Sequence, residues 1–260
     1  MIKFLEDGHR YIDDNNTSWR GVTTTISKFH EKFSTTPEAC SVRRPTKDKP
    51  NKWFGVAPTE IAEAWKSENE RSTFLGHNYH KTQEDNPKNP NNLPIYRCEY
   101  EGDAKIAGTQ KLVEGIYIEW ILFLKSIQLI GQADRVDVYG NKFSVLDFKT
   151  CKEIKKESYV GWEGHKMMLD PISHIQDSNY WHYALQLSIY ATMIMTHNPN
   201  LKLDKLILRH ILFEGIGQDK WGYPIYKIEN GNPIVKDEVD YEMPFLKSEV
   251  QSIFKALKQQ

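Results

Sequence analysis

GQADRVDVYGNKFSVLDFKT, residues 131–150, holds two strand-like runs that are rich in β-branched and aromatic residues and are separated by Gly140-Asn141. The runs are expected to pair as neighbouring antiparallel strands. Asp134 ends the first run, and thirteen residues later Asp147, with Phe148 and Lys149, ends the second. Across such a hairpin the two ends can meet, and the two carboxylates would then lie together.

Two carboxylates at one point repel each other unless a cation neutralises them. Oxygen ligands with positions left open for water favour magnesium, with manganese as a substitute, and the backbone carbonyl of Phe148 is a candidate third ligand. Lys149 lies two residues from Asp147 and therefore points to the same side of the strand. There it could orient or deprotonate an attacking water. The pattern favours metal-assisted phosphodiester hydrolysis without a covalent nucleophile.

An isolated D-x-K pattern is common by chance, and its aspartates could be ordinary strand-end residues. What favours a functional site is the order of several features along the chain. The last of these features is Gln186 with Tyr190, whose spacing puts two polar side chains on one helix face. Alone, these two residues could simply be packed on an apolar helix. The features are Gly76-x-x-x-His80, Glu119, Gly131-x-x-Asp134, Asp147-x-Lys149 and Gln186-x-x-x-Tyr190.

With these motifs the sequence resembles the RecB-type branch of the PD-(D/E)XK nuclease superfamily, especially its single-domain phage-like and mitochondrial genome-maintenance exonucleases. The resemblance spans residues 4–213 and implies an α/β fold with a restriction-endonuclease-like core, in which a mixed central β-sheet is flanked by helices. It further implies that the metal is bound by His80, Asp134 and Asp147 and that Lys149 is the catalytic lysine.

The same resemblance implies that Gln186 and Tyr190 lie beside the active site and help to hold the DNA strand or the lysine. The residue before Asp134 is Ala133 rather than proline, a variant that fits this branch. The iron–sulfur cysteines of some relatives are missing, as is a G-x-x-x-x-G-K-[ST] phosphate loop. We therefore exclude a cluster-bearing or ATP-driven helicase form.

Two interpretations of Glu119 stay open. Related nucleases often carry an acidic residue on the strand before the core hairpin, where it can support a second metal. The apolar neighbours at 117–118 and 120–121 are equally compatible with an outward-facing glutamate on an alternating strand. His77 competes with His80 as the histidine of the site, but only His80 has the family spacing from the preceding glycine.

The pattern predicts one domain over residues 1–260, with residues 1–55 forming an N-terminal hairpin around the turn-rich Asp13–Thr17 and a basic loop. Three antiparallel strands are expected from residue 116 to 149, with a further strand over Lys205–Phe213. Helices are expected from Thr59 to an interruption at Gly76, around His80 and Glu84, and over Ala104–Val113, Asn179–Thr196 and Pro244–Leu257.

Composition sets broader limits. The 34 Lys plus Arg nearly cancel the 35 Asp plus Glu, so the net charge of -1 does not by itself indicate a nucleic-acid partner, although a local basic path could accompany an acidic metal site. The three cysteines lie far apart, which indicates neither a disulfide framework nor a zinc site and favours a reducing, cytoplasmic setting. A charged start argues against a signal peptide, and no apolar run approaches membrane-spanning length.

Contacts with the DNA backbone are expected from Lys152, Lys155 and Lys156, because they directly follow the catalytic strand. Arg43 and Arg44 lie in the polar stretch 36–51, which could contact phosphate or simply be a solvated loop, the more common case for such clusters.

We therefore expect a magnesium-dependent DNA exonuclease that acts on single strands or DNA ends in replication, recombination or repair. It would work in the cytoplasm, or in the host cytoplasm if phage-encoded, and a recombinase or single-strand-binding protein could load it. The alternatives are a structure-specific endonuclease and a non-catalytic DNA-binding recombination subunit. The presence of Asp134, Asp147 and Lys149 argues against the non-catalytic alternative.

Overall fold

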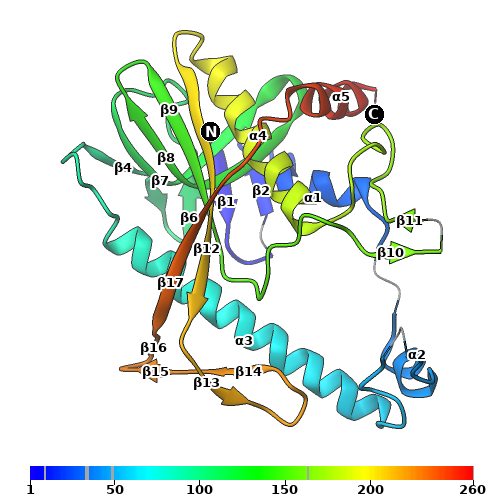
Figure 1. Ribbon diagram of the computed structural model, residues 1–260. Coiled ribbons are helices and arrows are strands. Elements are labelled where there is room, and N and C mark those ends of the chain that lie inside the picture. Colours follow the sequence, from blue (N-terminus) through cyan, green and yellow to red (C-terminus); the bar gives the residue numbers. More distant parts are fainter. Residues whose placement is uncertain (9, 33–34, 48–49, 163, 260) are drawn as a thin grey trace.

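The structure is a computed structural model that describes residues 1–8, 10–32, 35–47, 50–162 and 164–259. It is a mixed α/β fold in which helices pack on a sheet of parallel and antiparallel strands (Figure 1). Two positions of the basic stretch 36–51, residues 48 and 49, lie outside the described residues. Within the described residues, no helix is both long enough and apolar enough to cross a membrane.

The central sheet contains seven strands, β3 (Arg20–Gly21), β4 (Ile95–Arg97), β7 (Gly115–Leu124), β8 (Leu129–Tyr139), β9 (Lys142–Lys149), β12 (Lys202–Phe213) and β17 (Val235–Glu242). Their order is β17-β12-β9-β8-β7-β4, with β3 beside β8. β8 pairs antiparallel with β7 and β9, whereas β9 pairs parallel with β12. The prediction of three consecutive antiparallel strands, β7 to β9, is confirmed, as is the later strand β12.

β8 and β9 part from each other at one end. Their pairing runs from Tyr139↔Lys142 to Arg135↔Leu146, and beyond that point β9 continues beside β12 only. On the same edge of β8, β3 pairs with the first two residues, 129 and 130. Residues 131–134 between these two pairings have no strand partner on that edge among the described residues, and we call this stretch the gap of β8. Asp134 therefore lies inside a strand, and the prediction that it ends one is wrong.

Helices α3 (Pro58–Asp85) and α4 (Asn179–His197) pack on opposite faces of the sheet. Val145 of β9 belongs to the main core with α4, whereas Phe148 packs with Leu75 and Tyr79 of α3. Because successive side chains of a strand alternate between its faces, positions 145 and 148 face opposite ways. Figure 1 shows α3 crossing behind β12 and β17. The predicted apolar helix after residue 179 is confirmed, and α5 (Lys247–Lys258), the predicted terminal helix, packs on it.

The predicted interruption of the first long helix at Gly76 is wrong. α3 begins at Pro58 and continues without a break to Asp85. Thr59 therefore lies in the first turn of the helix and does not cap it. A glycine inside a helix costs only about 1 kcal/mol. Burial of Leu75 and Tyr79 on either side of it against the sheet offsets that cost.

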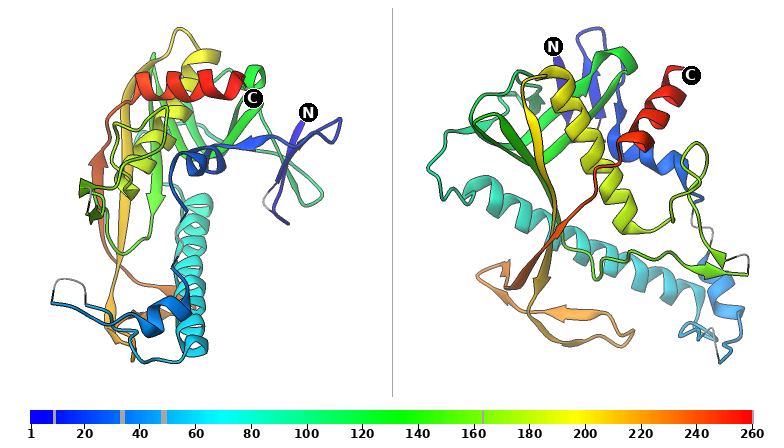
Figure 2. Two further views of the ribbon diagram at one scale, coloured as in Figure 1. Left: turned by 90° about the vertical axis from the view of Figure 1, so that its right-hand side faces the viewer. Right: turned by 45° about the horizontal axis from the view of Figure 1, so that its top comes forward.

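The predicted helix over Ala104–Val113 is also wrong. Residues 104–106 form β6, which pairs with β1 (Ile2–Leu5) in a second, antiparallel sheet of order β2-β1-β6-β5. This small sheet is completed by β2 (Arg10–Asp13) and β5 (Tyr100–Glu101). Part of the pairing of β6 could not be seen in the sequence, because β1 lies about a hundred residues earlier. The other part was a local signal, since the two-residue turn Gly102-Asp103 pairs β6 with β5 directly before it. Figure 2 shows the N-terminal strands on the same side of the central sheet as α3.

Shorter elements complete the chain. The basic stretch predicted as a loop contains a short helix, α2, because Thr36 accepts a hydrogen bond from the backbone N–H of Ala39 and caps it. The turn predicted at Asp13–Thr17 is confirmed: the chain reverses there after β2, Ile12 bridges Ser18 in antiparallel fashion, and the N–H of Trp19 donates to the carbonyl of Tyr11. The connection between β1 and β2 is a separate turn earlier in the chain. The other elements are α1 (Val22–Ile26), η1 (Ser27–Phe29), α2 (Pro37–Val42), η2 (Lys125–Ile127), β10 (Val160–Gly161), β11 (Gly164–His165), β13 (Gly215–Gln218), β14 (Pro224–Tyr226), β15 (Ile228–Glu229) and β16 (Asn232–Pro233).

Candidate active site

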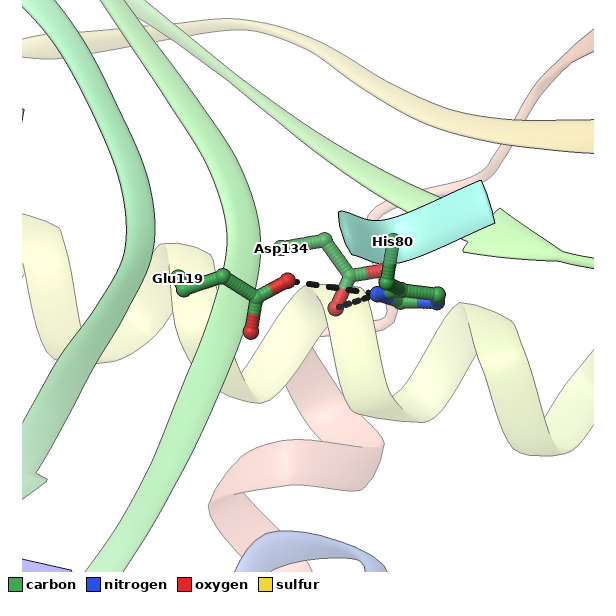
Figure 3. A group of neighbouring side chains, drawn as sticks. All are labelled: His80, Glu119 and Asp134. Atoms are coloured by element: carbon green, nitrogen blue, oxygen red, sulfur yellow. Dashed lines mark hydrogen bonds and ion pairs between the residues drawn. The ribbon is translucent and has the colours of Figure 1, made fainter. Parts of the chain in front are cut away.

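Three side chains from three different elements meet at the gap of β8. His80 comes from α3, Glu119 from β7 and Asp134 from β8, and their ligand-type atoms all lie within 4.8 Å of one another (Figure 3). The Nδ1 atom of His80 is 3.2 Å from Oε1 of Glu119 and 3.8 Å from Oδ1 of Asp134. In the part of the chain that the structure describes, this is the one cluster with the composition of a metal site.

The backbone of β7 is distorted at Glu119. β7 and β8 pair at Ile118↔Arg135 and at Trp120↔Ala133, so Glu119 lies opposite Asp134 at a position where the ladder is interrupted. Glu119 has φ +49°, in the left-handed region that costs a non-glycine residue about 1–3 kcal/mol. Such strain is typical of functional sites. The outward-facing interpretation of Glu119 therefore fails, because its side chain points to His80 and is only 13% exposed.

Asp134 takes the place of a strand partner. Its Oδ2 accepts a hydrogen bond of 2.7 Å from the backbone N–H of Phe148, just beyond the point where β9 leaves β8. Without that bond, a buried N–H of β9 would be left unpaired. The carboxylate is thus fixed in position by the same separation of strands that makes room for the site.

Tyr190 of α4 closes the gap from the other face. Its hydroxyl donates to the backbone carbonyl of Gln132 at 2.9 Å. Its ring lies so close to β8 that a Cβ on Gly131 would be 2.7 Å from a ring carbon and 2.9 Å from Val22. Only glycine fits there, which explains why the Gly131-x-x-Asp134 and Gln186-x-x-x-Tyr190 patterns occur together in this chain.

Asp147 and Lys149 form a buried ion pair behind the cluster. Nζ of Lys149 is 2.5 Å from Oδ2 of Asp147, and Nε2 of Gln186 donates to the other carboxylate oxygen at 3.0 Å. The Asp147 side chain is only 2% exposed, whereas that of Lys149 is 22% exposed. The ring of Tyr183, one turn before Gln186 on α4, lies 5.1 Å from the Lys149 ammonium and adds a cation–π contact.

The excess of negative charge shapes the titration of these groups. Burial raises the pKa of Asp134, His80 lowers it and Glu119 raises it again, with a net increase. Burial likewise raises the pKa of Asp147, to about 6, although Lys149 opposes the change. Burial alone would lower the pKa of His80, but the charges of Asp134 and Glu119 outweigh it and raise that pKa to about 9. The Lys149 pKa is also raised, because the nearby carboxylates outweigh burial.

A cleft of about 1060 Å³ opens over the three-residue cluster. Its floor includes His80, Glu119, Asp134 and the Gln186 and Tyr190 side chains, whereas Asp147 and Lys149 lie outside its lining. The walls come from the second half of α3, from residues 18–25 around β3 and α1, and from the small N-terminal sheet. The cleft thus connects the cluster with the part of the chain predicted as an N-terminal elaboration.

The basic residues predicted to contact DNA do not line this cleft. Lys152, Lys155 and Lys156 are exposed in the segment between β9 and α4, where the Lys156 ammonium lies over the rings of Tyr180 and Trp181. Arg43 and Arg44 are exposed just after α2.

The loop after α2 packs against the first turns of α3. The carbonyl of Arg43 accepts a hydrogen bond from Asn51, and neighbouring Trp53 packs on Ile61 of α3. Nineteen residues separate Ile61 from His80, about 28 Å along a helix axis. Contact of Arg43 or Arg44 with a bound strand would therefore require the strand to extend well beyond the cluster.

Sequence reasoning missed three residues of the site. Gln132 lies within the Gly131-x-x-Asp134 motif, and its Nε2 makes a very short contact with Oε2 of Glu119. Tyr183 supports Lys149, and Tyr11 of β2 is close enough to Glu119 and Tyr190 to interact with them electrostatically. The sequence offered a signal for two of them: Gln132 lies inside the Gly131-x-x-Asp134 motif, and Tyr183 lies one helical turn before Gln186. No local feature of the sequence indicated Tyr11.

Comparison of the chain with models of known protein families gave no match, and comparison with curated proteins gave no significant match.

Proposed function

We propose that this protein is a metal-dependent deoxyribonuclease of the RecB-type branch of the PD-(D/E)XK superfamily, with a restriction-endonuclease-like core. It would act as an exonuclease that hydrolyses phosphodiester bonds of single strands or DNA ends. The observation that carries the proposal is the convergence, at the gap of β8, of six side chains that are dispersed over more than a hundred positions of the sequence. They are His80, Glu119, Asp134, Asp147, Lys149 and Gln186.

The donor set fits a divalent cation. One imidazole nitrogen and two carboxylates lie within 4.8 Å of one another. Burial raises the pKa of Asp134, and the neighbouring Glu119 carboxylate adds to the increase that His80 opposes. Carboxylate oxygens favour Mg²⁺ or Mn²⁺. A Mg²⁺ or Mn²⁺ ion bound there would activate water and neutralise charge developing on the phosphate. His80, Glu119 and Asp134 would hold it, with Asp147 behind them, and the Phe148 carbonyl stays a predicted ligand.

The remaining residues position the reacting groups. Lys149 is a cation in this arrangement, since its pKa is raised, and this favours orientation of water and stabilisation of a phosphate oxygen over proton abstraction. Gln186 fixes the carboxylate that holds Lys149, and Tyr190 fixes the backbone of β8. Positioning of this kind contributes much of the rate in phosphoryl chemistry.

The size of the cleft favours a single strand over a duplex as the substrate. Its volume of about 1060 Å³ is close to that of clefts of about 300–1,000 Å³ that hold small ligands. A duplex, whose major groove alone is about 12 Å wide, would not enter such a space, whereas a few nucleotides of one strand would. The strand would reach the cluster through its end or after local melting.

The test is digestion of end-labelled single-stranded DNA, linear duplex and closed circular DNA in magnesium or manganese. Wild type is compared with Asp134→Asn, Lys149→Met and the control Asp204→Asn, which removes a surface carboxylate paired with Lys142 away from the site. We expect cleavage of linear substrates by wild type and the control, and its loss in both site variants.

The outcomes separate the alternatives. Cleavage of the closed circle by wild type would favour the structure-specific endonuclease. Absence of metal-dependent cleavage on every substrate, together with retained DNA binding, would favour the non-catalytic recombination subunit. Equal activity of wild type and both site variants would refute the proposed site.

A further inference from the structure

We propose that Lys105 binds a backbone phosphate of a single DNA strand in the cleft, away from the phosphate that is cut. The inference rests on the proposed nuclease function and extends it from the metal cluster to the small N-terminal sheet. It gives that sheet the role of holding the strand while the cluster acts on it.

Lys105 belongs to a row of side chains that crosses the whole small sheet. Tyr11 pairs with Phe4, Phe4 pairs with Lys105, and Lys105 pairs with Tyr100. Residues paired directly across neighbouring strands point to the same face of a sheet. Tyr11, Phe4 and Lys105 all line the cleft, so this face of the sheet is the wall opposite α3.

The Lys105 ammonium has no anionic partner among the residues that the structure describes. The residue is only 5% exposed; its Nζ lies 5.7 Å from the centroid of the Tyr100 ring, and its charge opposes the increase that burial causes in the pKa of the Cys98 thiol. A buried charge is unfavourable unless it is paired. An ammonium enclosed at the wall of a cleft, without a carboxylate, is therefore suited to an anion that enters the cleft.

Lys3 provides the contrast within the same sheet. It is the neighbour of Phe4 on β1, so its side chain points to the opposite face. There it forms an ion pair of 2.7 Å with Glu101. Of the two lysines in this small sheet, the partly exposed Lys3 on the far face has a carboxylate partner, whereas the buried Lys105 in the cleft has none among the described residues.

The row of paired residues places Lys105 in the same cleft as the cluster but away from it. Tyr11, at the near end of the row, interacts electrostatically with Glu119. Lys105 lies two strands further along, about 10 Å at the usual spacing of neighbouring strands. Arg10 and Lys28, both exposed, also line the cleft, as do the carboxylates of Glu6 and Glu84. The cleft is thus lined by both basic and acidic side chains, and Lys105 is the buried cation among them. It is not a member of the three-residue cluster.

The experiment measures binding of a fluorescent single-stranded oligodeoxythymidylate by anisotropy, in EDTA and over a series of salt concentrations. The proteins are wild type, Lys105→Met, Lys105→Arg and the matched control Lys3→Met. We expect Lys105→Met to bind about tenfold more weakly at low salt, as for loss of a charged hydrogen bond. The slope of log K against log salt should fall by about 0.7, the value for one phosphate contact on a single strand. Lys105→Arg should retain most of the affinity, and Lys3→Met should match wild type.

A second measurement guards against a merely structural effect. Methionine replaces the buried cation with an apolar chain of similar size, so the melting temperature of Lys105→Met should be equal to or above that of wild type. A clear drop in melting temperature would assign Lys105 to the stability of the sheet and overturn the inference. Unchanged affinity and salt slope in Lys105→Met would also overturn it.

Failure of the inference is distinguishable from failure of the nuclease proposal. If wild type cleaves DNA and Lys105→Met binds the strand as well as wild type does, the proposed phosphate contact of Lys105 is refuted and the proposed nuclease function is retained. If no substrate is cleaved but Lys105→Met still loses affinity and salt slope in EDTA, the phosphate contact stands without the catalytic role.

Discussion

On the α4 side of β9, Asp147 is ion-paired with Lys149 and hydrogen-bonded by Gln186, whereas on the cleft side Glu119 and Asp134 share His80 as their ion-pair partner. The first group has its charges matched within the protein. In the second group two carboxylates face one imidazole. The proposed site requires this difference: a lysine held in place on the α4 side, and on the cleft side two carboxylates whose charge a bound cation would neutralise.

The comparison predicts opposite stability effects for substitutions on the two sides. The largest effect on activity is expected for Asp134→Asn, with loss of at least about three orders of magnitude in cleavage rate. The metal-free variant should nevertheless melt at a higher temperature than wild type. The Asp134 pKa is raised above its ordinary value of 3.8 in the folded protein, so its charged form is disfavoured there. The group therefore lowers stability as the pH rises above 3.8, and the loss is complete once the pH exceeds the folded pKa.

Differential scanning fluorimetry in EDTA at neutral pH measures this effect, with Asp204→Asn as the control. A lower melting temperature for Asp134→Asn than for wild type would mean that its hydrogen bond from Phe148 outweighs the repulsion. The contrast between the two sides would then disappear.

Lys149→Met should lower both activity and stability, because it leaves the Asp147 carboxylate buried without its cation. Breaking a buried ion pair costs about 3–5 kcal/mol, and the partial exposure of Lys149 places the expected loss near the lower end. Urea unfolding of the metal-free protein gives the value. The double variant Asp147→Asn with Lys149→Met should recover much of the loss; if it is no more stable than Lys149→Met alone, the pair is not the cause.

His80 should make stability and metal affinity respond to pH in opposite directions. Its pKa rises from 6.5 to about 9 on folding, so its contribution to stability is fully present below pH 6.5 and is lost as the pH rises through about 9. Over the same interval metal affinity should increase, because the metal competes with a proton for the imidazole.

Thermal unfolding in EDTA and calorimetric titration with Mn²⁺ across this pH interval measure the two trends. His80→Gln should flatten both, whereas His77→Gln, which changes an exposed histidine one turn away, should flatten neither. Identical pH profiles for wild type and His80→Gln would place the titration elsewhere.

The smallest effects are expected from the exposed basic residues. The joint variant Arg43→Ala with Arg44→Ala should leave the affinity for a short oligonucleotide within about twofold of wild type and reduce it only for strands long enough to extend along α3. Replacement of Lys152, Lys155 and Lys156 with alanine should produce a larger loss, because they directly follow β9, which carries Asp147 and Lys149. Anisotropy with oligonucleotides of graded length decides the order; equal losses at all lengths would contradict this placement of Arg43 and Arg44.

Much of the central fold could be predicted from the sequence because it depends on local patterns. The runs that became β7, β8 and β9 carry their strand composition and turn residues within themselves, and the apolar helix α4 does too. The helix predicted over Ala104–Val113 is wrong for two reasons: the local turn Gly102-Asp103, which pairs β6 with β5, was overlooked, and the pairing of β6 with the distant β1 is invisible in the sequence. Gly76 was misread as a break because packing of its neighbours against the sheet, invisible in sequence, outweighs its weak helix propensity.

The sequence by itself determined which residue types are available to the site: Asp134, Asp147 and Lys149 on two neighbouring strands, and Gln186 with Tyr190 one helical turn apart. Only the tertiary structure decided that β9 leaves β8 after Leu146, that Glu119 takes a left-handed conformation opposite Asp134, and that Lys105 lies at the wall of the cleft. The physical reason is that spacing along a chain restricts which side chains share a face of one strand or helix. Charge neutralisation, burial and strand separation depend instead on which distant segments are brought into contact.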